Sequence, residues 1–362
     1  MNALHLYLQN LDHNYRYIRK HLQPSTQCIG VVKAAAYGSH SIAFAKRLVE
    51  LGIDSLAVAY TEEGVQLRES GILTPIMVFY PQKDTLQSLL HADLEPCLYS
   101  KELMETFESL LNQNGIQNYP IHIKYNTGLH RVGFTLEEIN WVLDKIVAPC
   151  FQLKTVYSHL AASEEKRPSS QCDLQIQRFQ HIREQHSHSN KNLPKFHLLN
   201  SSGVFNYPEL QFDAVRCGIA LHGFANRPEW DQQLKPIAEL ETHISQIHEV
   251  HEGESVGYDQ GWKASKNSRI ACLPLGHADG IGRHYGNQRS SVQIHGNQAP
   301  VVGNVCMDML MVDVTEIQCK EGDRVLLFGK DYTASDFASQ GGTISYEILT
   351  AIGPRIKRIL HP

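Results

Sequence analysis

The sequence lacks several features that would assign it to a specialised class of protein. No apolar run approaches the length of a membrane-spanning helix. Lys and Arg number 33 against 38 Asp and Glu, so a net charge of -5 provides no basic excess for nucleic acid. Residues 1–20 lack the apolar core and cleavage site of a signal peptide. We therefore expect a cytoplasmic protein that binds neither membranes nor nucleic acid.

The cysteines and histidines do not show the spacings of disulfide-rich or zinc-binding proteins. Eight cysteines are scattered without a C-x-x-C pair, and the 20 histidines include no H-E-x-x-H motif. We expect free thiols in a reducing compartment and no metal site.

The composition is that of an ordinary globular protein, with 42% apolar and 20% charged residues. A chain of 362 residues is too long for one ordinary core, so we expect two domains. No internal repeat or low-complexity tract is visible.

The first 220 residues alternate between short β-rich runs and segments with helical periodicity. Thr135 and Glu138 form a capping box ahead of one helix, and Ser100 caps another that Gly115 ends. Eight strands separated by helices predict a parallel (β/α)8 barrel rather than an open doubly wound sheet. The expected strands are Cys28–Val32, Ser55–Ala59, Ile76–Phe79, Leu94–Cys97, Ile121–Lys124, Leu153–Tyr157, Phe196–Leu199 and Phe212–Arg216.

The character of the sequence changes after about residue 235. Short segments rich in β-branched residues are separated by Gly, Asn and Asp, and helix signals are nearly absent until Ser345–Ile352. We expect a barrel over 8–235 and an all-β domain over 236–362, the latter joined by a strand at 1–7. Its expected strands are His243–Val250, Arg269–Pro274, Ser291–Ile294, Pro300–Val305, Met309–Val314 and Arg324–Phe328.

Polar residues follow five of the eight expected barrel strands, at the end where barrel enzymes carry their chemistry. Lys33 ends the first strand and Lys124 the fifth. Ser158–His159 ends the sixth, Asn200–Gly203 the seventh and Arg216–Ile219 the eighth. Singly, each has a plain structural interpretation, such as a core histidine, a surface cation or a helix cap. Together, at one mouth of the barrel, they indicate an active site.

Lys33 and the loops after the last two strands point to one cofactor. Burial at the end of an apolar strand would lower the pKa of Lys33 and provide an amine for a Schiff base. The alternative is a lysine that reaches out to solvent. Asn200–Gly203 and Gly218–Ile219 supply small residues, hydroxyls and free amides where barrels bind phosphate. A Schiff-base lysine and a phosphate-binding site in the same barrel mouth indicate pyridoxal 5'-phosphate.

Nine segments that span nearly the whole chain carry a family resemblance. They are VVKAAAYG, KYNTGLHRVGF, YSHLAASE, LLNSSG, VRCGIALHG, SVGYDQGW, GHADGIGR, VGNVCMDMLMVDVT and ISYEILTAIGPRIKR. In this order and at this spacing they resemble the alanine racemase family, which consists of fold-type III pyridoxal-phosphate enzymes.

The resemblance implies a role for each matching residue. Lys33 would bind the cofactor covalently and act as one acid/base, and Tyr258 would act as the other from the partner subunit of a homodimer. Arg216 would face the pyridine nitrogen, and His159 would hydrogen bond to Tyr258. The family pattern further implies cofactor contacts at Tyr37, Asn200, Ser201, Gly218, Ile219 and Tyr346, substrate contacts at Arg131, Met307, Asp308 and His277, and a carbamate position at Lys124.

The two-base scheme also follows from the chemistry of racemisation. Inversion through a planar carbanion needs a proton removed from one face and delivered to the other. Lys33 belongs to the barrel and serves one face only, so the second base must come from something that covers the mouth. An ordinary tyrosine has a pKa of about 10 and needs hydrogen-bond or cationic help to accept a proton near neutrality.

Three positions depart from the family pattern. Ala35 stands where members usually have asparagine, and Asn126 where they usually have aspartate. His277 replaces a tyrosine expected near the substrate entrance, and this leaves the amino-acid preference open, with serine or a broad range as alternatives.

Two other functional classes compete with a racemase. Pyridoxal-phosphate decarboxylases of basic amino acids share the barrel and β domain, but they place a carboxylate at the pyridine nitrogen where this chain has Arg216. A non-enzymatic pyridoxal-phosphate carrier would need only the barrel, and a descendant without turnover would not need both bases. We therefore expect an alanine racemase that supplies D-alanine for peptidoglycan.

Overall fold

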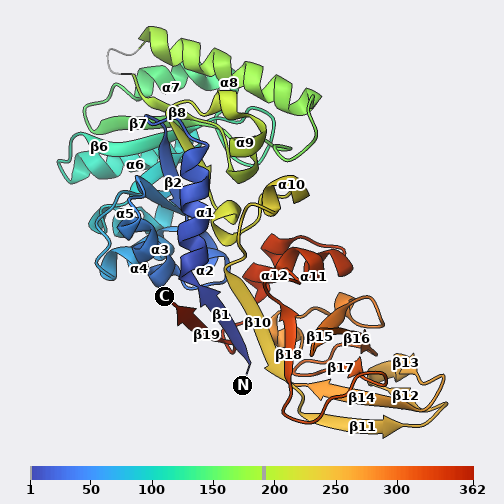
Figure 1. The fold of residues 1–362 in the computed structure, drawn as a ribbon. Coiled ribbons are helices and arrows are strands. Elements are labelled where there is room, and N and C mark those ends of the chain that lie inside the picture. Colours follow the sequence, from blue (N-terminus) through green and yellow to red (C-terminus); the bar gives the residue numbers. More distant parts are fainter. Residues whose placement is uncertain (1, 190–192) are drawn as a thin grey trace.

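Eight parallel strands close into a barrel in the computed structural model, which describes residues 2–189 and 193–362 (Figure 1). The barrel closes where β2 pairs with β9. Every strand expected from the sequence has a counterpart, so the prediction of a (β/α)8 barrel is confirmed. The strands are β2 (Gln27–Val31), β3 (Ser55–Val58), β4 (Ile76–Val78), β5 (Glu95–Leu98), β6 (Tyr119–Lys124), β7 (Phe151–Tyr157), β8 (Lys195–His197) and β9 (Ala214–Cys217).

Helices pack around the barrel and begin where the sequence indicated. Ser100 Oγ accepts a hydrogen bond from the backbone N–H of Leu103, and the Thr135–Glu138 capping box is present. None of the helices in the described part of the chain is both long and apolar enough to cross a bilayer. The helices of this half are α1 (Leu8–Lys20), α3 (Ser41–Glu50), α4 (Thr61–Glu69), α5 (Leu86–His91), α6 (Lys101–Gln113), α7 (Ile139–Lys145), α8 (Ser170–Ser189), α9 (Ser201–Asn206) and α10 (Pro228–Asp231).

A nine-stranded sheet forms the second half of the molecule, at the lower right of Figure 1. Its strand order is β11-β14-β17-β16-β15-β18-β10-β1-β19, and β12 pairs only with β13. The expected all-β domain is therefore confirmed. The strands are β1 (Ala3–Tyr7), β10 (Ala238–His243), β11 (Gln246–Val250), β12 (Ser255–Val256), β13 (Trp262–Lys263), β14 (Ser268–Leu273), β15 (Ser291–Ile294), β16 (Asn297–Val302), β17 (Leu310–Asp313), β18 (Arg324–Phe328) and β19 (Lys357–His361).

The second half also contains two helices, α11 (Ala334–Gln340) and α12 (Ser345–Ala351). The second is predicted from the sequence, and the first is not. Thr333 and Asp336 form a capping box at the start of α11, and Phe337 is fully buried. The same capping signals stand at Thr135, but Phe337 is the only large apolar residue of α11, so no apolar period marks this helix in the sequence.

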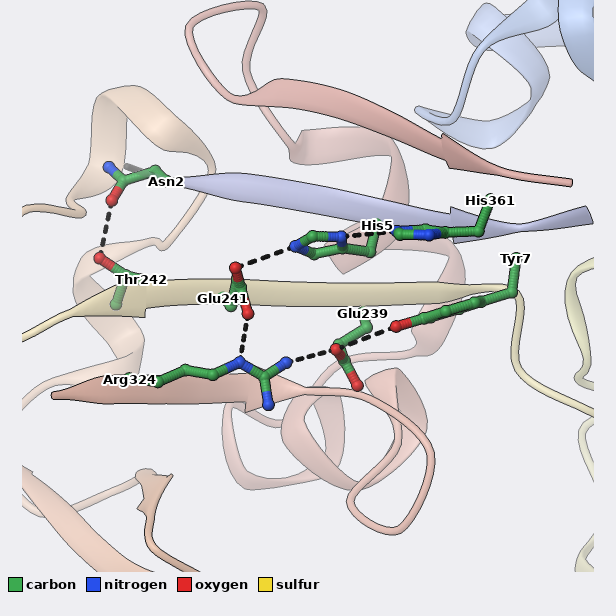
Figure 2. Close-up of polar contacts among 8 residues, drawn as sticks. All are labelled: Asn2, His5, Tyr7, Glu239, Glu241, Thr242, Arg324 and His361. Atoms are coloured by element: carbon green, nitrogen blue, oxygen red, sulfur yellow. Dashed lines mark hydrogen bonds and ion pairs between the residues drawn. The ribbon is translucent and has the colours of Figure 1, made fainter.

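A row of polar side chains joins four strands of the sheet, as Figure 2 shows. His5 on β1 lies between His361 on β19, with ring nitrogens 2.8 Å apart, and Glu241 on β10 at 2.9 Å. Arg324 on β18 bonds to both Glu241 and Glu239. Side chains as well as backbone pairing thus join β1 and β19, the first and last strands of the chain, to β10 and β18.

The C-terminal elements return to the barrel beside Lys33. Arg358 on β19 donates to the backbone oxygen of Gly38 at 3.0 Å from Nη2 and 3.3 Å from Nε. A Cβ atom at Gly38 would lie 2.0 Å from the carbonyl oxygen of Leu349, so only glycine fits where α12 meets this segment. The β domain therefore supports the turn that follows Lys33.

The segment after Lys33 has an unusual backbone. Ala34, Ala35, Ala36 and Tyr37 all have φ between 52° and 55°, and Gly38 follows at φ 77°. A left-handed conformation costs an L-residue about 1–2 kcal/mol, and four such residues in a row are rare. The contacts that hold this turn must offset that cost.

Ala35 lies in this turn with its side chain exposed, so its replacement by asparagine tests the strain directly. Asparagine tolerates the left-handed region better than alanine does, and we expect the Ala35→Asn variant to gain about 0.5–1 kcal/mol in free energy of unfolding. Urea denaturation measures the change. Ala43→Asn in the right-handed helix α3 is the matched control and should lose about 0.5 kcal/mol. Equal losses in both variants would show that the turn is not strained at Ala35.

Candidate active site

A cavity of about 260 Å³ opens at the C-terminal ends of the barrel strands. The strand-end rule placed the chemistry at this mouth, and the structure brings most of the expected residues together there. The sequence-predicted residues that line the cavity are Lys33, Tyr37, Lys124, Arg131, His159, Asn200, Ser201, Arg216, Gly218, Ile219 and Tyr346.

Four further residues line the cavity that the sequence analysis did not name, namely Val31, Phe79, Tyr80 and Tyr157. Tyr157 is the last residue of β7, and Phe79 and Tyr80 follow the end of β4. The strand-end rule would have located them if aromatic residues had been included with the charged ones.

Lys33 follows β2 directly and is half-buried. Burial lowers the pKa of its amine, the charge of Arg131 lowers it further, and Glu63 opposes both effects. A lowered pKa increases the fraction of neutral amine, which is the form that attacks carbonyl compounds. The environment expected for Lys33 from the sequence is therefore present.

Hydroxyl groups surround the end of the cavity near α9. Ser201 Oγ accepts hydrogen bonds from the backbone N–H groups of Gly218, at 3.0 Å, and Ala220, at 3.2 Å. Its own hydrogen is thus free for a ligand. A Cβ atom at Gly218 would lie 2.2 Å from the hydroxyl oxygen of Tyr37, so glycine leaves the room that this tyrosine occupies. Tyr346 contributes a third hydroxyl, which accepts from Asn226.

Arg216 is 3% exposed and is held by neutral acceptors. Its Nη2 donates to the backbone oxygens of Ser158, at 2.7 Å, and Leu198, at 2.9 Å. Burial lowers the pKa of the guanidinium to about 10, so it stays charged at neutral pH. Within residues 2–189 and 193–362, Arg216 forms no ion pair and its Nε has no hydrogen bond, which leaves that N–H for a ligand acceptor.

A path of hydrogen bonds crosses the barrel from Arg216 to Glu95. Arg216 Nη1 lies 2.5 Å from His197 Nδ1, and His197 Nε2 lies 2.9 Å from Thr155 Oγ1. Thr155 Oγ1 is 2.8 Å from His122 Nδ1, whose Nε2 is 2.9 Å from Glu95 Oε2. Because a guanidinium only donates, His197 must accept at Nδ1 and donate at Nε2, and each later link follows in the same direction. The path joins a cation to a carboxylate through neutral groups.

Thr155 is the middle of this path, and the Thr155→Val change removes its hydroxyl with little change in shape. We expect a loss of about 1–3 kcal/mol in free energy of unfolding, because buried histidine nitrogens lose their partners. We also expect weaker cofactor binding, because His197 no longer holds Arg216. Thr61→Val is the control, since Thr61 is 1% exposed and bonds to Thr85 instead. Equilibrium dialysis of cofactor distinguishes the two, and an unchanged affinity in Thr155→Val would contradict the coupling.

Lys124 and Arg131 also line the cavity, and both cations lie near the ring of Tyr80. Lys124 Nζ is 5.5 Å from the ring centre, and the Arg131 guanidinium carbon is 5.7 Å from it. Lys124 is 3% exposed, and burial together with Arg131 lowers its pKa to about 7. Neither cation has a hydrogen bond or ion pair among the described residues, so both are available to an anion.

The cavity therefore suits an anionic, phosphate-bearing carbonyl compound. Lys33, Lys124, Arg131 and Arg216 provide positive charge, and its described lining contains no Asp or Glu. The three hydroxyls and the backbone near Gly218 match a phosphate, and Lys33 matches a carbonyl carbon. The residues present fit the cofactor that the sequence indicated.

Four predicted residues lie on the β domain, away from this cavity. Tyr258 is 67% and Met307 59% exposed, and with Asp308 they line a separate hollow of about 660 Å³. His277 is exposed, and its N–H donates to the oxygen of Cys306. His159 contacts Arg216 and Asn200 rather than Tyr258. Within one chain, the cavity at the barrel mouth and the hollow on the β domain are therefore separate.

Comparison with known proteins matches both halves of the chain. The model of the alanine racemase N-terminal domain matches residues 6–226, and that of the alanine racemase C-terminal domain matches residues 237–360. The alanine racemase of Clostridium novyi is 35% identical over 368 residues, which cover 97% of this chain and 93% of the relative.

Solved structures agree with the sequence matches. The alanine racemase of Streptomyces lavendulae superposes with a TM-score of 0.95 at 27% identity, covering 100% of this chain and 97% of that one. The alanine racemase of Bartonella henselae, with covalently bound pyridoxal phosphate, superposes with a TM-score of 0.90 at 28% identity and covers 99% of both chains.

Proposed function

This chain belongs to the alanine racemase family, and we propose that it interconverts L- and D-alanine with pyridoxal 5'-phosphate as its cofactor. The observation that carries the proposal is the barrel-mouth cavity, which combines Lys33, the Arg216 guanidinium and the hydroxyls around Gly218. The curated relative and the solved structures, named as alanine racemases, support it.

The residues that would hold the cofactor are those of the barrel mouth. Lys33 would bind it covalently, and Tyr37, Ser201 and Tyr346 would donate hydrogen bonds to its phosphate. Arg216 would donate to its pyridine nitrogen. The guanidinium keeps its proton near neutrality, so it would leave that nitrogen unprotonated. When bound, the cofactor withdraws electrons and so weakens the C–H bond at the α-carbon of the substrate.

Proton transfer at the α-carbon needs a group on each face. Lys33 moves the proton on the barrel side, where its lowered pKa makes the neutral amine accessible. Tyr258 moves the proton on the opposite side. Arg131 orients the substrate by binding its carboxylate, and the backbone of Met307 completes that end from the β domain, beside Asp308, whose carboxylate pairs with Arg355. In one turnover one of the two bases, Lys33 or Tyr258, gains a proton and the other loses one, so proton exchange with water or a turnover in the reverse direction restores the starting state.

We propose that the protein acts as a homodimer, because Tyr258 and the cavity lie in separate places on one chain. The β-domain hollow exposes apolar side chains at Tyr258, Met307 and Met309, which is the character of a surface that a second subunit covers. In a two-fold dimer, each hollow would cover the barrel mouth of the other copy, and His159 would then reach Tyr258.

We place the enzyme in the cytoplasm, where its D-alanine would supply peptidoglycan precursors. All eight cysteines are free, and Cys28, Cys97, Cys150, Cys172 and Cys217 are buried. Free thiols are stable in a reducing compartment, which supports this location.

Lys124 is the proposed carbamate. With a pKa of about 7, a substantial fraction of its amine is neutral near pH 7, and a neutral amine adds to carbon dioxide to give a carbamate and one proton. The product is an anion, which the neighbouring Arg131 would stabilise. Carbon-13 NMR of protein equilibrated with labelled bicarbonate tests this: a carbamate signal should appear and should vanish in Lys124→Met.

Incubation with single L-amino acids in heavy water tests the proposed reaction. Deuterated D-alanine, detected by chiral separation and mass spectrometry, is the expected product. Exchange without inversion would contradict the two-base scheme, and no exchange with any substrate would favour a carrier. The ranking of alanine against serine shows what His277 does to the preference.

A further inference from the structure

One carboxylate lies next to the turn that carries Lys33, and the family resemblance assigned it no role. Glu63 is in the first turn of α4, half-buried, and outside the lining of the cavity. Both of its oxygens are engaged. Oε1 accepts from the backbone N–H of Ala34 at 2.6 Å, and Oε2 accepts from Ala59 at 2.7 Å and Tyr60 at 3.3 Å.

These bonds join two strand ends of the barrel. Ala34 is the first left-handed residue after Lys33, while Ala59 and Tyr60 connect β3 to α4. A hydrogen bond to a carboxylate is about twice as strong as a neutral one, so the bond to Ala34 offsets part of the cost of the left-handed turn. Arg358 holds the other end of the turn at Gly38.

Glu63 is also the source of negative charge next to Lys33, because the described lining of the cavity contains no Asp or Glu. Arg131 opposes the charged form of Lys33, and Glu63 favours it. The other ionisable groups of the cavity are Lys124, Arg216, His159, Tyr37, Tyr80, Tyr157 and Tyr346, none of which is an acid of the Asp or Glu type.

We propose that Glu63 is the positioning residue for Lys33: its carboxylate holds the left-handed turn in place and balances the positive charge of the amine. The main-chain bond fixes where the Lys33 backbone starts, and therefore where its side chain enters the cavity. The charge keeps enough ammonium present for Lys33 to return a proton as well as remove one. The proposal rests on the proposed function only in taking Lys33 as the lysine that binds the cofactor.

The test measures the attachment of pyridoxal 5'-phosphate to Lys33 in the cofactor-free, full-length protein as a function of pH. Borohydride reduction at short times and mass analysis of the Lys33 peptide give the rate, without any need for racemisation. Only the neutral amine attacks, so the midpoint of the pH–rate curve reports the protonation of Lys33, and the alkaline plateau reports its placement.

Two variants separate the effect of the negative charge of Glu63 from the effect of its side-chain length. Glu63→Gln loses the charge and one of the two acceptors, so the midpoint should move to lower pH and the plateau should fall by about tenfold. Glu63→Asp keeps the charge but is one methylene shorter, so the midpoint should stay near that of the wild type while the plateau falls. Glu62→Gln, an exposed neighbour in the same helical turn, is the control and should change neither.

Equal plateau losses in both variants with unmoved midpoints would overturn the electrostatic part of the proposal. Wild-type curves in Glu63→Gln would overturn the whole of it. A failed racemase assay on the wild-type protein would refute the proposed function but would leave these attachment curves interpretable.

Discussion

Replacing Lys33 by alanine will abolish the covalent attachment of pyridoxal 5'-phosphate and lower racemisation by at least about 10⁴-fold, the upper end of what one positioned acid–base group supplies. The loss is this large because one side chain performs two tasks, holding the cofactor and moving the proton on the barrel face. The absorption band of the lysine–cofactor linkage and the reduced peptide adduct measure attachment, and chiral analysis measures activity.

Lys33→Arg separates charge from nucleophilicity. It keeps a cation in the cavity, but a guanidinium does not condense with an aldehyde under these conditions, so it should be as inactive as the alanine variant. Lys46→Ala, at an exposed position on α3, should behave as wild type. A reducible adduct in Lys33→Ala at another lysine would assign the cofactor to that residue instead.

Replacing Tyr258 by phenylalanine will leave cofactor attachment intact and lower racemisation by about 10²–10⁴-fold. Only the hydroxyl is lost, and Tyr258 is not among the residues that line the cavity and would hold the cofactor. Exchange of the α-proton on the Lys33 side should continue, so deuterium should enter L- or D-alanine without inversion. Tyr60→Phe is the control, because Tyr60 is also exposed and lies outside the cavity lining.

Mixing the two inactive variants tests whether the second base comes from a partner. In a heterodimer of Lys33→Ala with Tyr258→Phe, one site carries both defects and the other carries neither. After subunit exchange, about a quarter of the wild-type activity should return, because half of the dimers are mixed and half of their sites are intact. Activity that stays at the level of the single variants would place both bases within one chain.

The barrel was predictable because its signals are local and repeated. Each strand is a short apolar run, and each polar residue at a strand end faces the same mouth, so the sequence alone places Lys33 and Lys124 together. Helix α11 was missed although Thr333 and Asp336 carry the signature that located the helix at Thr135. The only large apolar residue of α11 is Phe337, whereas Leu136, Ile139, Leu143 and Ile146 recur at helical spacing after Thr135.

Other parts of the site could not be predicted, because they depend on contacts between distant segments. Alanine is the strongest former of right-handed helix, so nothing in Ala34–Ala36 indicates a left-handed turn. In the sequence, Glu63 resembles an ordinary capping residue of α4. Its hydrogen bond to Ala34 cannot be predicted, because the two residues are 29 positions apart. The path from Glu95 to Arg216 runs through five strands, and its partners share no sequence spacing.

The hydrogen bonds from Arg358 to Gly38 can form only after the C-terminal strand β19 has been synthesised. A ribosome releases all eight barrel strands well before α12 and β19. The backbone oxygen of Gly38 nevertheless accepts its hydrogen bonds from Arg358 on β19. Tyr346 on α12 supplies one of the hydroxyls proposed for the phosphate. A nascent barrel would therefore present Lys33 in a loose turn with an unfinished anion pocket. We therefore expect pyridoxal 5'-phosphate to bind only after Arg358 has been translated. Chains truncated before Arg358 should lack the absorption band of the bound cofactor.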